Sequence, residues 1–291
     1  MKYRNFLLNA ILSIVASLPF GLLYLLSDFL YLVVYHIIGY RKKIVYDNVT
    51  KSFPDKNPKE IQRIIKQFYK NFCDVILEVI KSQKMLPSEL EKRVHFTNRE
   101  LFDHYFEKKK SVLASLGHCG NWEWVGNKIA LFLKHDGGAV YKPVHDQFFD
   151  DYMIAQRQKY KNTLMIDYRK VFKTLVSLRN KLYTVFVLAD QSPALHETDY
   201  FVTFLGRKTA FYNGMEKVAR ALDYAVIYLD IIRRKRGFYQ VEVKVITDSA
   251  ANTKTDEITL NYVSLLEESI IKQPDNWLWS HKRWKKNTEE D

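Results

Sequence analysis

The sequence predicts an α/β protein with a mixed, largely parallel sheet flanked by helices, preceded by an N-terminal hydrophobic, membrane-anchoring helical segment. From Ser111 onward, apolar runs of strand character alternate with segments of helical periodicity, a pattern typical of α/β proteins. Before that, residues 5–27 include no charged side chain, and the apolar character resumes from Phe29 to Ile38. With 291 residues, of which 47% are hydrophobic, the chain can fill one large core.

The N-terminal segment 1–43 is predicted to be a membrane anchor. As one helix it would exceed the hydrocarbon core of a bilayer, which is about 30 Å thick, and Pro19 falls in its middle. Basic residues at both ends favour a cytoplasmic position for both. We therefore expect a broken hydrophobic helix or hairpin, or an in-plane anchor, followed by one folded domain over 44–291. The alternatives are a plain single span and a helix buried in a soluble core.

Two helices are predicted between the anchor and the sheet. The first begins at Asn57, which can act as N-cap, with Pro58 at the first helical position and Glu60 in the first turn. Its apolar residues recur at three- and four-residue spacing from Ile61 to Ile80. We expect this stripe to pack on the core, with membrane contact as the alternative. The second helix is expected over 97–110.

The remaining chain alternates between strand and helix candidates. The strand candidates are 111–116, 138–142, 164–167, 182–189 and 224–232. The helix candidates between them are 121–134, 147–161, 170–180 and 211–222. Residues 238–246 alternate in polarity and are expected to pair with 224–232 as a hairpin, and a last amphipathic helix is expected over 255–272. Because no linker or repeat interrupts this pattern, we predict one domain after the anchor.

Polar side chains follow several of the predicted strands at the point where each strand ends. His118 follows the first strand, Tyr141 and Lys142 end the second, and Asp190 and Gln191 end the fourth. In open α/β sheets, binding sites gather beyond the carboxyl ends of the strands. We therefore expect these side chains to lie close together.

His118 and Glu123 flank the start of the helix candidate 121–134. A histidine can take the proton of an attacking hydroxyl, a carboxylate can orient the ring, and the free amides of a helix start can stabilise an oxyanion. This pattern favours acyl transfer, with His118 as base and Glu123 as its orienting group. The alternative is that His118 satisfies the turn and Glu123 only stabilises its helix. Cys119 is interpreted as a small neutral filler, because adjacent residues on a turn point apart.

These features resemble the lipid A biosynthesis acyltransferases, and the resemblance covers nearly the whole chain. It rests on His118 and Glu123 as a His-x4-Glu motif. The other matching positions are Asn48 with Ser52, Phe53 and Pro54; Tyr141, Lys142 and Pro143; Arg157; Ala189, Asp190 and Gln191; and the string from Pro274 to Lys285. The string from Pro274 to Lys285 is the most specific of these.

The resemblance implies transfer of a fatty acyl group from an acyl carrier protein thioester to a hydroxyl of a lipid A precursor, an anionic glycolipid, at the cytoplasmic face of the inner membrane. Arg157, with Lys142 nearby, would hold substrate phosphate or stabilise the oxyanion. Tyr141, Asn121, Asp190 and Gln191 are further substrate-binding candidates, and Trp277 and Arg283 are candidates for support. The family commonly has Tyr-Arg-Pro where this chain has Lys142, which puts bidentate contact there in doubt.

The composition is consistent with anionic partners. A formal net charge of +12 suits a membrane surface, an acidic carrier protein or nucleic acid, and the anchor favours the membrane over nucleic acid. No metal site and no cofactor are predicted, because the two cysteines lack paired spacing and no dinucleotide or P-loop motif occurs. Two alternatives stay open: an acyltransferase with another lipid acceptor, such as a lysophospholipid or an aminolipid, and a non-catalytic basic membrane-binding protein.

Overall fold

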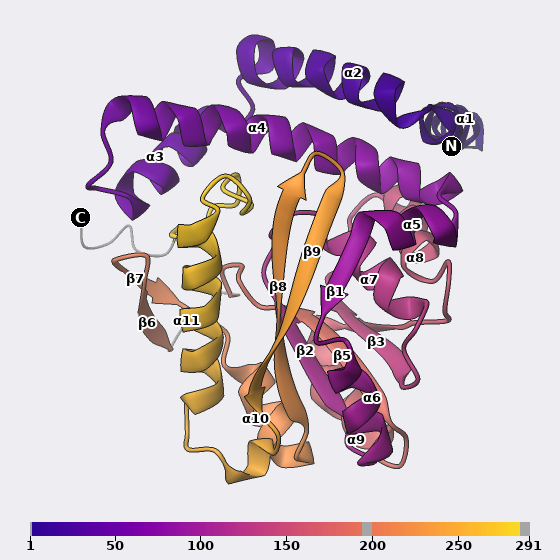
Figure 1. Ribbon diagram of the computed structural model, residues 1–291, viewed down its shortest axis with the longest axis vertical. Helices are drawn as coiled ribbons and strands as arrows, with labels where there is room; N and C mark the ends of the chain where they lie inside the picture. The colour runs from indigo at the N-terminus through magenta and orange to yellow at the C-terminus, as the bar shows by residue number, and fades with distance from the viewer. Residues whose placement is uncertain (1, 194–199, 286–291) are drawn as a thin grey trace.

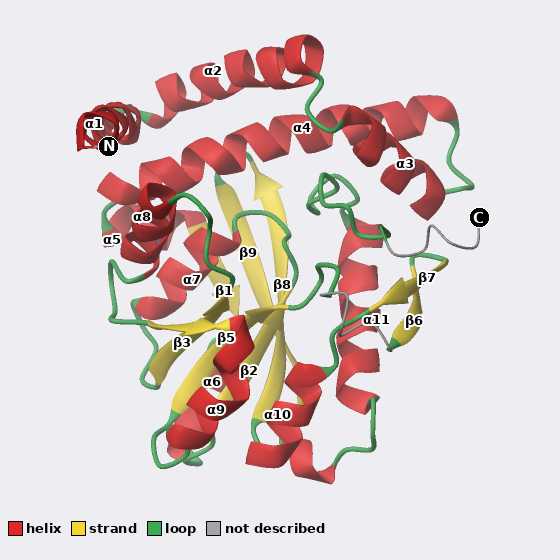
Figure 2. Cartoon of the chain, turned by 180° about the vertical axis from the view of Figure 1, so that it is seen from behind, coloured by secondary structure: helices red, strands yellow, loops and turns green. Residues whose placement is uncertain are grey.

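A seven-stranded sheet forms the centre of the molecule, with helices on both faces (Figures 1 and 2). The computed structural model describes residues 2–193 and 200–285. The strand order is β1-β9-β8-β2-β5-β3-β4, and every neighbouring pair is parallel except the β8–β9 hairpin. The predicted fold class, a mixed and largely parallel sheet flanked by helices, is therefore confirmed.

The strands of this sheet are β1 (Val94–Thr97), β2 (Val112–Leu116), β3 (Asp136–Tyr141), β4 (Leu164–Asp167), β5 (Tyr183–Leu188), β8 (Ala225–Lys235) and β9 (Phe238–Thr247). A separate antiparallel hairpin consists of β6 (Phe201–Phe204) and β7 (Arg207–Ala210). The short strands β1, β6 and β7 were not predicted. Each has four residues, as β4 also has, but β1 precedes the alternating pattern that begins at Ser111, and β6 and β7 lie between two of its predicted segments.

The central strand β2 is buried along its whole length, because helices cover the sheet on both sides. Val112, Ala114 and Leu116 belong to the larger of two core clusters, and Leu113 belongs to the smaller. This arrangement explains the continuous apolar run before His118, which is the mark of a parallel strand with two covered faces.

The helices around the sheet agree in type with the predicted segments but are shorter. They are α6 (Glu100–Glu107), α7 (Trp122–Ala130), α8 (Gln147–Arg157), α9 (Val171–Ser177), α10 (Gly214–Leu222) and α11 (Glu257–Lys272). One further helix, α5 (Pro87–Arg93), was not predicted. Short 3-10 turns occur at Ser82–Lys84, Tyr168–Lys170 and Ala250–Asn252.

The N-terminal helices form a layer across one end of the sheet (Figure 1). They are α1 (Lys2–Ser17), α2 (Phe20–Tyr31) with its π-helical continuation η1 (Leu32–Ile38), α3 (Lys42–Ser52) and α4 (Pro58–Lys81). The predicted break at Pro19 is confirmed. Helix α1 is seen end-on and α2 from the side, so the two helices meet at a steep angle (Figures 1 and 2). Lys81 Nζ donates to the carbonyls of Ala16 and Leu18, at 2.9 and 2.7 Å, and so satisfies the end of α1.

Helix α4 joins this layer to the sheet. Asn57 accepts hydrogen bonds from the amides of Lys59 and Glu60 and completes a capping box, as its sequence predicted. The first half of the stripe faces inward, since Ile61, Ile64 and Phe68 belong to the larger core, whereas Ile76 in its second half is 37% exposed. Core packing of this helix is thus confirmed.

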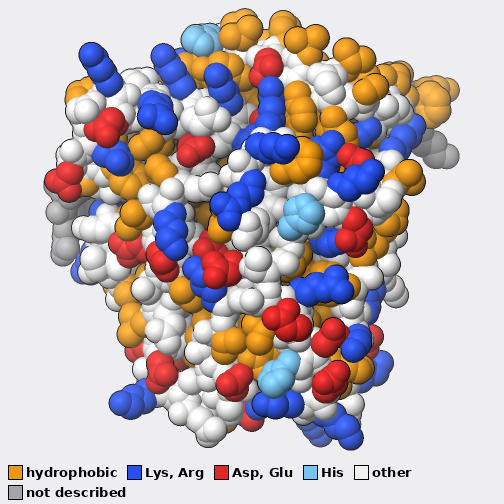
Figure 3. Space-filling view, viewed as in Figure 1, with side chains coloured by type: hydrophobic (Ala, Val, Ile, Leu, Met, Phe, Trp, Pro, Cys, Tyr) orange, Lys and Arg blue, Asp and Glu red, His pale blue; other side chains and the backbone are white. Residues whose placement is uncertain are grey.

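The outer surface of α1, α2 and η1 is apolar (Figure 3, top). Its exposed residues include Tyr3, Phe6, Leu7, Ile11, Ile14, Leu22, Leu25, Phe29, Leu32, Ile37 and Ile38. The stretch Phe20–Ile38 is long and apolar enough to cross a membrane, and only 11% of it is buried. The alternative of a helix buried in the core is therefore wrong. The division into an anchor, 1–43, and a domain, 44–291, stays a prediction, and residues 286–291 lie outside the described part.

Candidate active site

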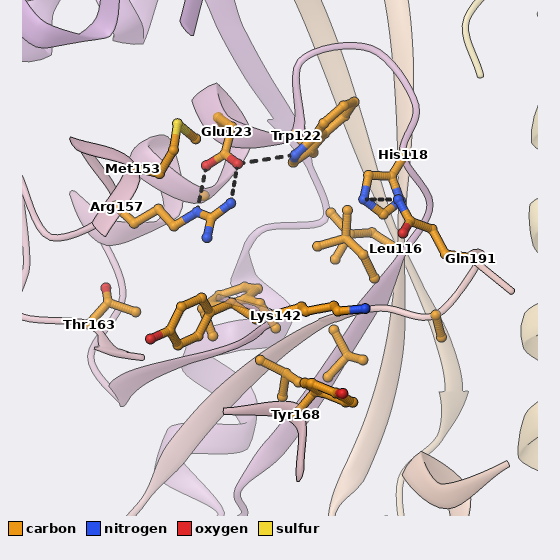
Figure 4. A pocket seen from close by; sticks show the side chains of 18 of the residues that line it. Leu116, His118, Trp122, Glu123, Lys142, Met153, Arg157, Thr163, Tyr168 and Gln191 are labelled. Atoms are coloured by element: carbon orange, nitrogen blue, oxygen red, sulfur yellow. Dashed lines mark hydrogen bonds and ion pairs between the residues drawn. The ribbon is translucent and has the colours of Figure 1, made fainter. Parts of the chain in front are cut away.

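A cavity of about 540 Å³ opens beyond the carboxyl ends of β2, β3 and β5, between the sheet and helices α7 and α8 (Figure 4). Its size falls in the range of about 300–1,000 Å³ that is usual for ligand sites. Its wall is apolar along Ile129, Leu133 and Val140, and polar where His118 and Glu123 lie. The cavity therefore offers an apolar chamber beside a polar centre.

His118 reaches the cavity because two glycines shape the turn after β2. A Cβ at Gly117 would lie 2.5 Å from Leu266 Cδ1, so only glycine allows the close approach of α11. Gly120 has a φ of +55°, which favours glycine. The sequence of this turn thus fixes the direction of the His118 side chain.

Asp190, two residues beyond β5, is the hydrogen-bond partner of His118. Its Oδ1 lies 2.6 Å from His118 Nδ1, and its Oδ2 accepts from the His118 amide at 2.9 Å and from Trp277 Nε1 at 2.7 Å. Burial alone would raise the pKa of the Asp190 carboxyl, but the charge of His118 and the hydrogen bonds from His118 and Trp277 lower this pKa to about 2. Asp190 is therefore ionised at neutral pH.

An ionised Asp190 determines the tautomer of His118. The proton must sit on His118 Nδ1, where it is donated to Asp190, so Nε2 carries the lone pair. Gln191 Nε2 lies 3.2 Å from His118 Nε2 and donates to it. A substrate hydroxyl that replaced this amide would meet a histidine nitrogen ready to accept its proton.

Glu123 pairs with Arg157, which corrects the expectation that Glu123 orients His118. Arg157 donates from Nε at 3.0 Å and from Nη2 at 2.6 Å to the two oxygens of Glu123, and Trp122 Nε1 donates at 3.2 Å (Figure 4). Burial would lower the pKa of the Arg157 guanidinium, but Glu123 outweighs it and raises this pKa. The first turn of α7 aims Glu123 at α8, so its carboxylate holds Arg157 in the cavity wall.

Tyr141, Lys142 and Gln191 line the same cavity, as their positions at strand ends predicted. Lys142 extends across the cavity toward the side on which His118 lies (Figure 4). Its Nζ lies 5.8 Å from the centroid of the Tyr168 ring. Lys142 thus brings a positive charge into the cavity without the forked geometry of an arginine.

Asn121 is not placed to bind substrate, and its assignment as a binding residue is corrected. Its Oδ1 accepts from the Trp124 amide at 2.9 Å, and its Nδ2 donates to Glu78 Oε2 at 3.0 Å. Asn121 is fully buried and does not line the cavity. It is the N-cap of α7 and ties that helix to α4.

The C-terminal segment 274–285 packs against the active site. Trp277 is buried and contacts Asp190, not the cavity, which agrees with the supporting role expected for it. Arg283 is also buried, stacks over the ring of Phe211 with its Cζ at 4.3 Å from the centroid, and has a pKa that burial lowers to about 10. Neither Arg283 nor Asp190 lines the cavity, so neither is placed to bind substrate directly.

His281 lines the cavity, although the sequence assigned it no role. Its Nε2 accepts from the Ser192 amide at 3.1 Å, and its backbone carbonyl accepts from Asn48 Nδ2 at 3.0 Å. Burial and neighbouring cations lower the pKa of His281 to about 4, so its ring is neutral at pH 7. The available signal was its place in the string from Pro274 to Lys285, which is rich in aromatic and basic residues.

Cys119 is buried beside His118, and burial raises the pKa of its thiol well above the ordinary value. A thiol in this state is a poor nucleophile. The interpretation of Cys119 as a neutral filler is therefore consistent with the structure.

The fold and the site together define an α/β protein with an apolar N-terminal surface and a histidine–carboxylate pair at the mouth of a partly apolar cavity. The sequence matches the bacterial lipid A biosynthesis acyltransferase family over residues 1–286, and the chain belongs to this family. The resemblance predicted from the motifs is thus confirmed. A comparison with curated proteins found no match. The family is one of membrane-associated acyltransferases, which supports acyl transfer to a substrate of the lipid A type.

Proposed function

We propose that this protein transfers a fatty acyl group from an acyl carrier protein thioester to a hydroxyl of a lipid A precursor at the cytoplasmic face of the inner membrane. One observation carries the proposal: His118 Nε2 faces the cavity while Nδ1 lies 2.6 Å from a buried, ionised Asp190. This arrangement suits a general base for a hydroxyl, because Asp190 fixes the tautomer and stabilises the imidazolium that forms.

In the proposed reaction, His118 Nε2 takes the proton of the acceptor hydroxyl as the oxygen attacks the thioester carbonyl. The tetrahedral intermediate then collapses, the carbon–sulfur bond breaks, and the departing thiolate takes the proton from His118. Arg157, which is held by Glu123, and Lys142 supply positive charge to the cavity. This charge can stabilise the oxyanion of the intermediate or bind a substrate phosphate. The apolar wall beyond them suits the acyl chain.

The membrane setting is supported by the apolar surface of α1, α2 and η1. Helix α1 lies close to the cavity, because Arg4 Nη1 on α1 is 3.1 Å from Asp146, the N-cap of α8, and α8 carries Arg157. The formal charge of +12 suits an acidic carrier protein and an anionic leaflet.

The decisive experiment is a transfer assay with the full-length protein. Acyl carrier protein thioesters of several chain lengths are incubated with a tetra-acylated lipid A precursor, and the acceptor is analysed by mass spectrometry. A mass gain of one acyl group is expected. Transfer to a lysophospholipid or an aminolipid in parallel reactions, without transfer to the lipid A precursor, would overturn the proposed acceptor.

A further inference from the structure

A second cavity, of about 700 Å³, lies beneath α2, between α4 and the tip of the β8–β9 hairpin. We call it the basic cleft. Four cations line it, Lys70, Arg233, Lys235 and Arg236, together with the carboxylates of Asp28, Asp74 and Asp275. The reaction centre at His118 is not part of this lining, so the cleft needs its own explanation.

Two of the three carboxylates of the cleft are paired with its arginines. Asp74 accepts from Arg233 Nη2 and from Arg236 Nη2, both at 2.6 Å. Asp28 accepts from Arg236 Nη2 at 2.8 Å. The third carboxylate of the cleft, Asp275, accepts from the side chain of Asn71 at 2.7 Å. The carboxylates of the cleft thus fix its arginines in place.

Four cations and three carboxylates leave the cleft with a net charge of +1, and among the described residues its two lysines are held by no carboxylate. Lys70 Nζ lies 5.6 Å from the ring centroid of Tyr31, and Lys235 Nζ lies 4.3 Å from that of Phe238. Within residues 2–193 and 200–285, no carboxylate pairs with either ammonium group, and both side chains are exposed. Two ammonium groups with donors to spare, beside two fixed guanidinium groups, suit a phosphate.

A shallow hollow lies between the basic cleft and the active site. It is lined by Asn71, Arg233 and Asp275, which also line the cleft, and by His118 and Trp122, which also line the active-site cavity. His118 therefore borders both the apolar cavity and this hollow, whose other side is formed by residues of the cleft. A substrate with a polar head can contact the cleft and present a hydroxyl to His118 at the same time.

The cleft also lies at the boundary of the apolar N-terminal surface. Tyr31 and Leu32 line it, and Leu32 is 52% exposed beside the other apolar side chains of α2 and η1. Figure 3 shows Lys and Arg side chains directly below this apolar band. A lipid whose chains stay in the bilayer would hold its head group at this level.

We propose that the basic cleft binds a phosphate of the acceptor lipid, with Lys70 and Lys235 as its contacts, while the acceptor hydroxyl lies at His118. The proposal rests on the proposed function, because it assigns the acceptor to one side of His118 and the acyl chain of the donor to the other. Arg233 and Arg236 add positive potential without moving from their carboxylate partners.

The test measures equilibrium binding of the tetra-acylated acceptor to the full-length protein in neutral detergent micelles. The double variant Lys70→Met and Lys235→Met is compared with Lys66→Met and Arg234→Met, which replace exposed cations of the same helix and hairpin that do not line the cleft. We expect the cleft variant to weaken acceptor binding about tenfold or more and the control variant to change it less than about twofold.

Phosphatase-treated acceptor and phosphatidylglycerol identify the recognised group. Phosphatase-treated acceptor should bind the wild type and the cleft variant equally. The inference is overturned if the control variant weakens binding as much as the cleft variant, if neither does, or if phosphatase-treated acceptor shows the same loss. It is also overturned if phosphatidylglycerol binds as tightly as the acceptor and responds equally to the variants, because the cleft would then hold any phospholipid head group.

A kinetic measurement distinguishes a failure of this inference from a failure of the proposed function. In the transfer assay, the cleft variant should raise the KM for the acceptor about tenfold and leave the KM for the thioester unchanged. A wild-type protein that binds the phosphorylated acceptor through the cleft but transfers no acyl group would contradict the proposed function and support the cleft.

Discussion

The imidazole of His118 and the carboxylate of Asp190 meet across two neighbouring parallel strands, with His118 Nδ1 2.6 Å from Asp190 Oδ1. The register that pairs Leu116 of β2 with Leu188 of β5 places the two residues two positions beyond their strands. Because Asp190 is buried and held by Trp277 as well, the ring of His118 has one orientation and one tautomer.

Replacing Asp190 by asparagine should therefore lower kcat by about 10²- to 10⁴-fold, the usual contribution of acid–base catalysis. Asp190 accepts from three donors, His118 Nδ1, the His118 amide and Trp277 Nε1. An asparagine has only one acceptor oxygen, so its NH2 group would face one of these donors. His118 would then carry its proton on Nε2, and this tautomer cannot accept the proton of a substrate hydroxyl there. Steady-state kinetics would show the loss of kcat, and unchanged near-ultraviolet circular dichroism would show that the fold is intact. The double variant of Asp190→Asn with His118→Ala should be no slower than His118→Ala alone. A near-normal kcat in Asp190→Asn would refute the pairing as the basis of catalysis.

Glu123→Gln should destabilise the protein through Arg157. Removing the carboxylate leaves a largely buried guanidinium without its charged partner, and a hydrogen bond to a charged group contributes about 1.5–3 kcal/mol. Denaturant unfolding of Glu123→Gln, Arg157→Gln and the double variant should give strongly non-additive losses. As a control, Asp151, which is exposed on α8, should tolerate substitution by asparagine. Additive losses for Glu123 and Arg157 would contradict a coupled pair.

Stability should fall as the pH is lowered from about 6.5 to 4, in part through His281. The pKa of its folded form is depressed to about 4, so below the ordinary value of 6.5 the unfolded chain binds a proton that the folded chain does not. After allowance for the partial exposure of the ring, the effect is about 2 kcal/mol. His281→Gln should flatten the dependence of the unfolding free energy on pH in this window. An equally steep dependence in that variant would assign the effect to other groups.

Acidic side chains on the outer face of α2 should weaken membrane association. Leu25 and Phe29 are 66% and 63% exposed, and a charge carried to the centre of a bilayer costs about 2.5–3.5 kcal/mol. Leu25→Glu with Phe29→Glu should shift the protein from the membrane to the soluble fraction in vesicle flotation. Val245→Glu, which adds a charge at an exposed apolar residue of β9, should leave flotation unchanged. Equal flotation of all variants would show that this face does not enter the lipid.

The sequence allowed the fold and the place of the site to be predicted, because both depend on local patterns. Alternating strands and helices specify a parallel sheet, and the polar residues His118, Tyr141 and Gln191 do meet beyond its carboxyl ends. The capping role of Asn121 was also visible, since asparagine directly before a helix is a standard N-cap. Its place between His118 and Glu123 in the motif favoured a binding role instead.

The pairing of charges could not be predicted. Glu123 is close to His118 in sequence, but the first turn of α7 carries its carboxylate toward Arg157 on α8. Asp190 reaches His118 only through the register of β2 and β5, which no local pattern specifies. Proximity along the chain thus favoured the wrong carboxylate, and the order of strands in the sheet decided the right one.

Trp277 has a consequence for the order of events during synthesis. The segment around it pairs with the turn of His118, through the amide of Gly120 to Asn276 and the amide of Leu278 to the carbonyl of His118. Residues 276–278 lie far beyond 118–120 in the sequence, so a ribosome makes the turn of His118 well before the segment that holds it. The turn of His118 and the side chain of Asp190 therefore gain these hydrogen bonds only after every described strand of the sheet has been synthesised.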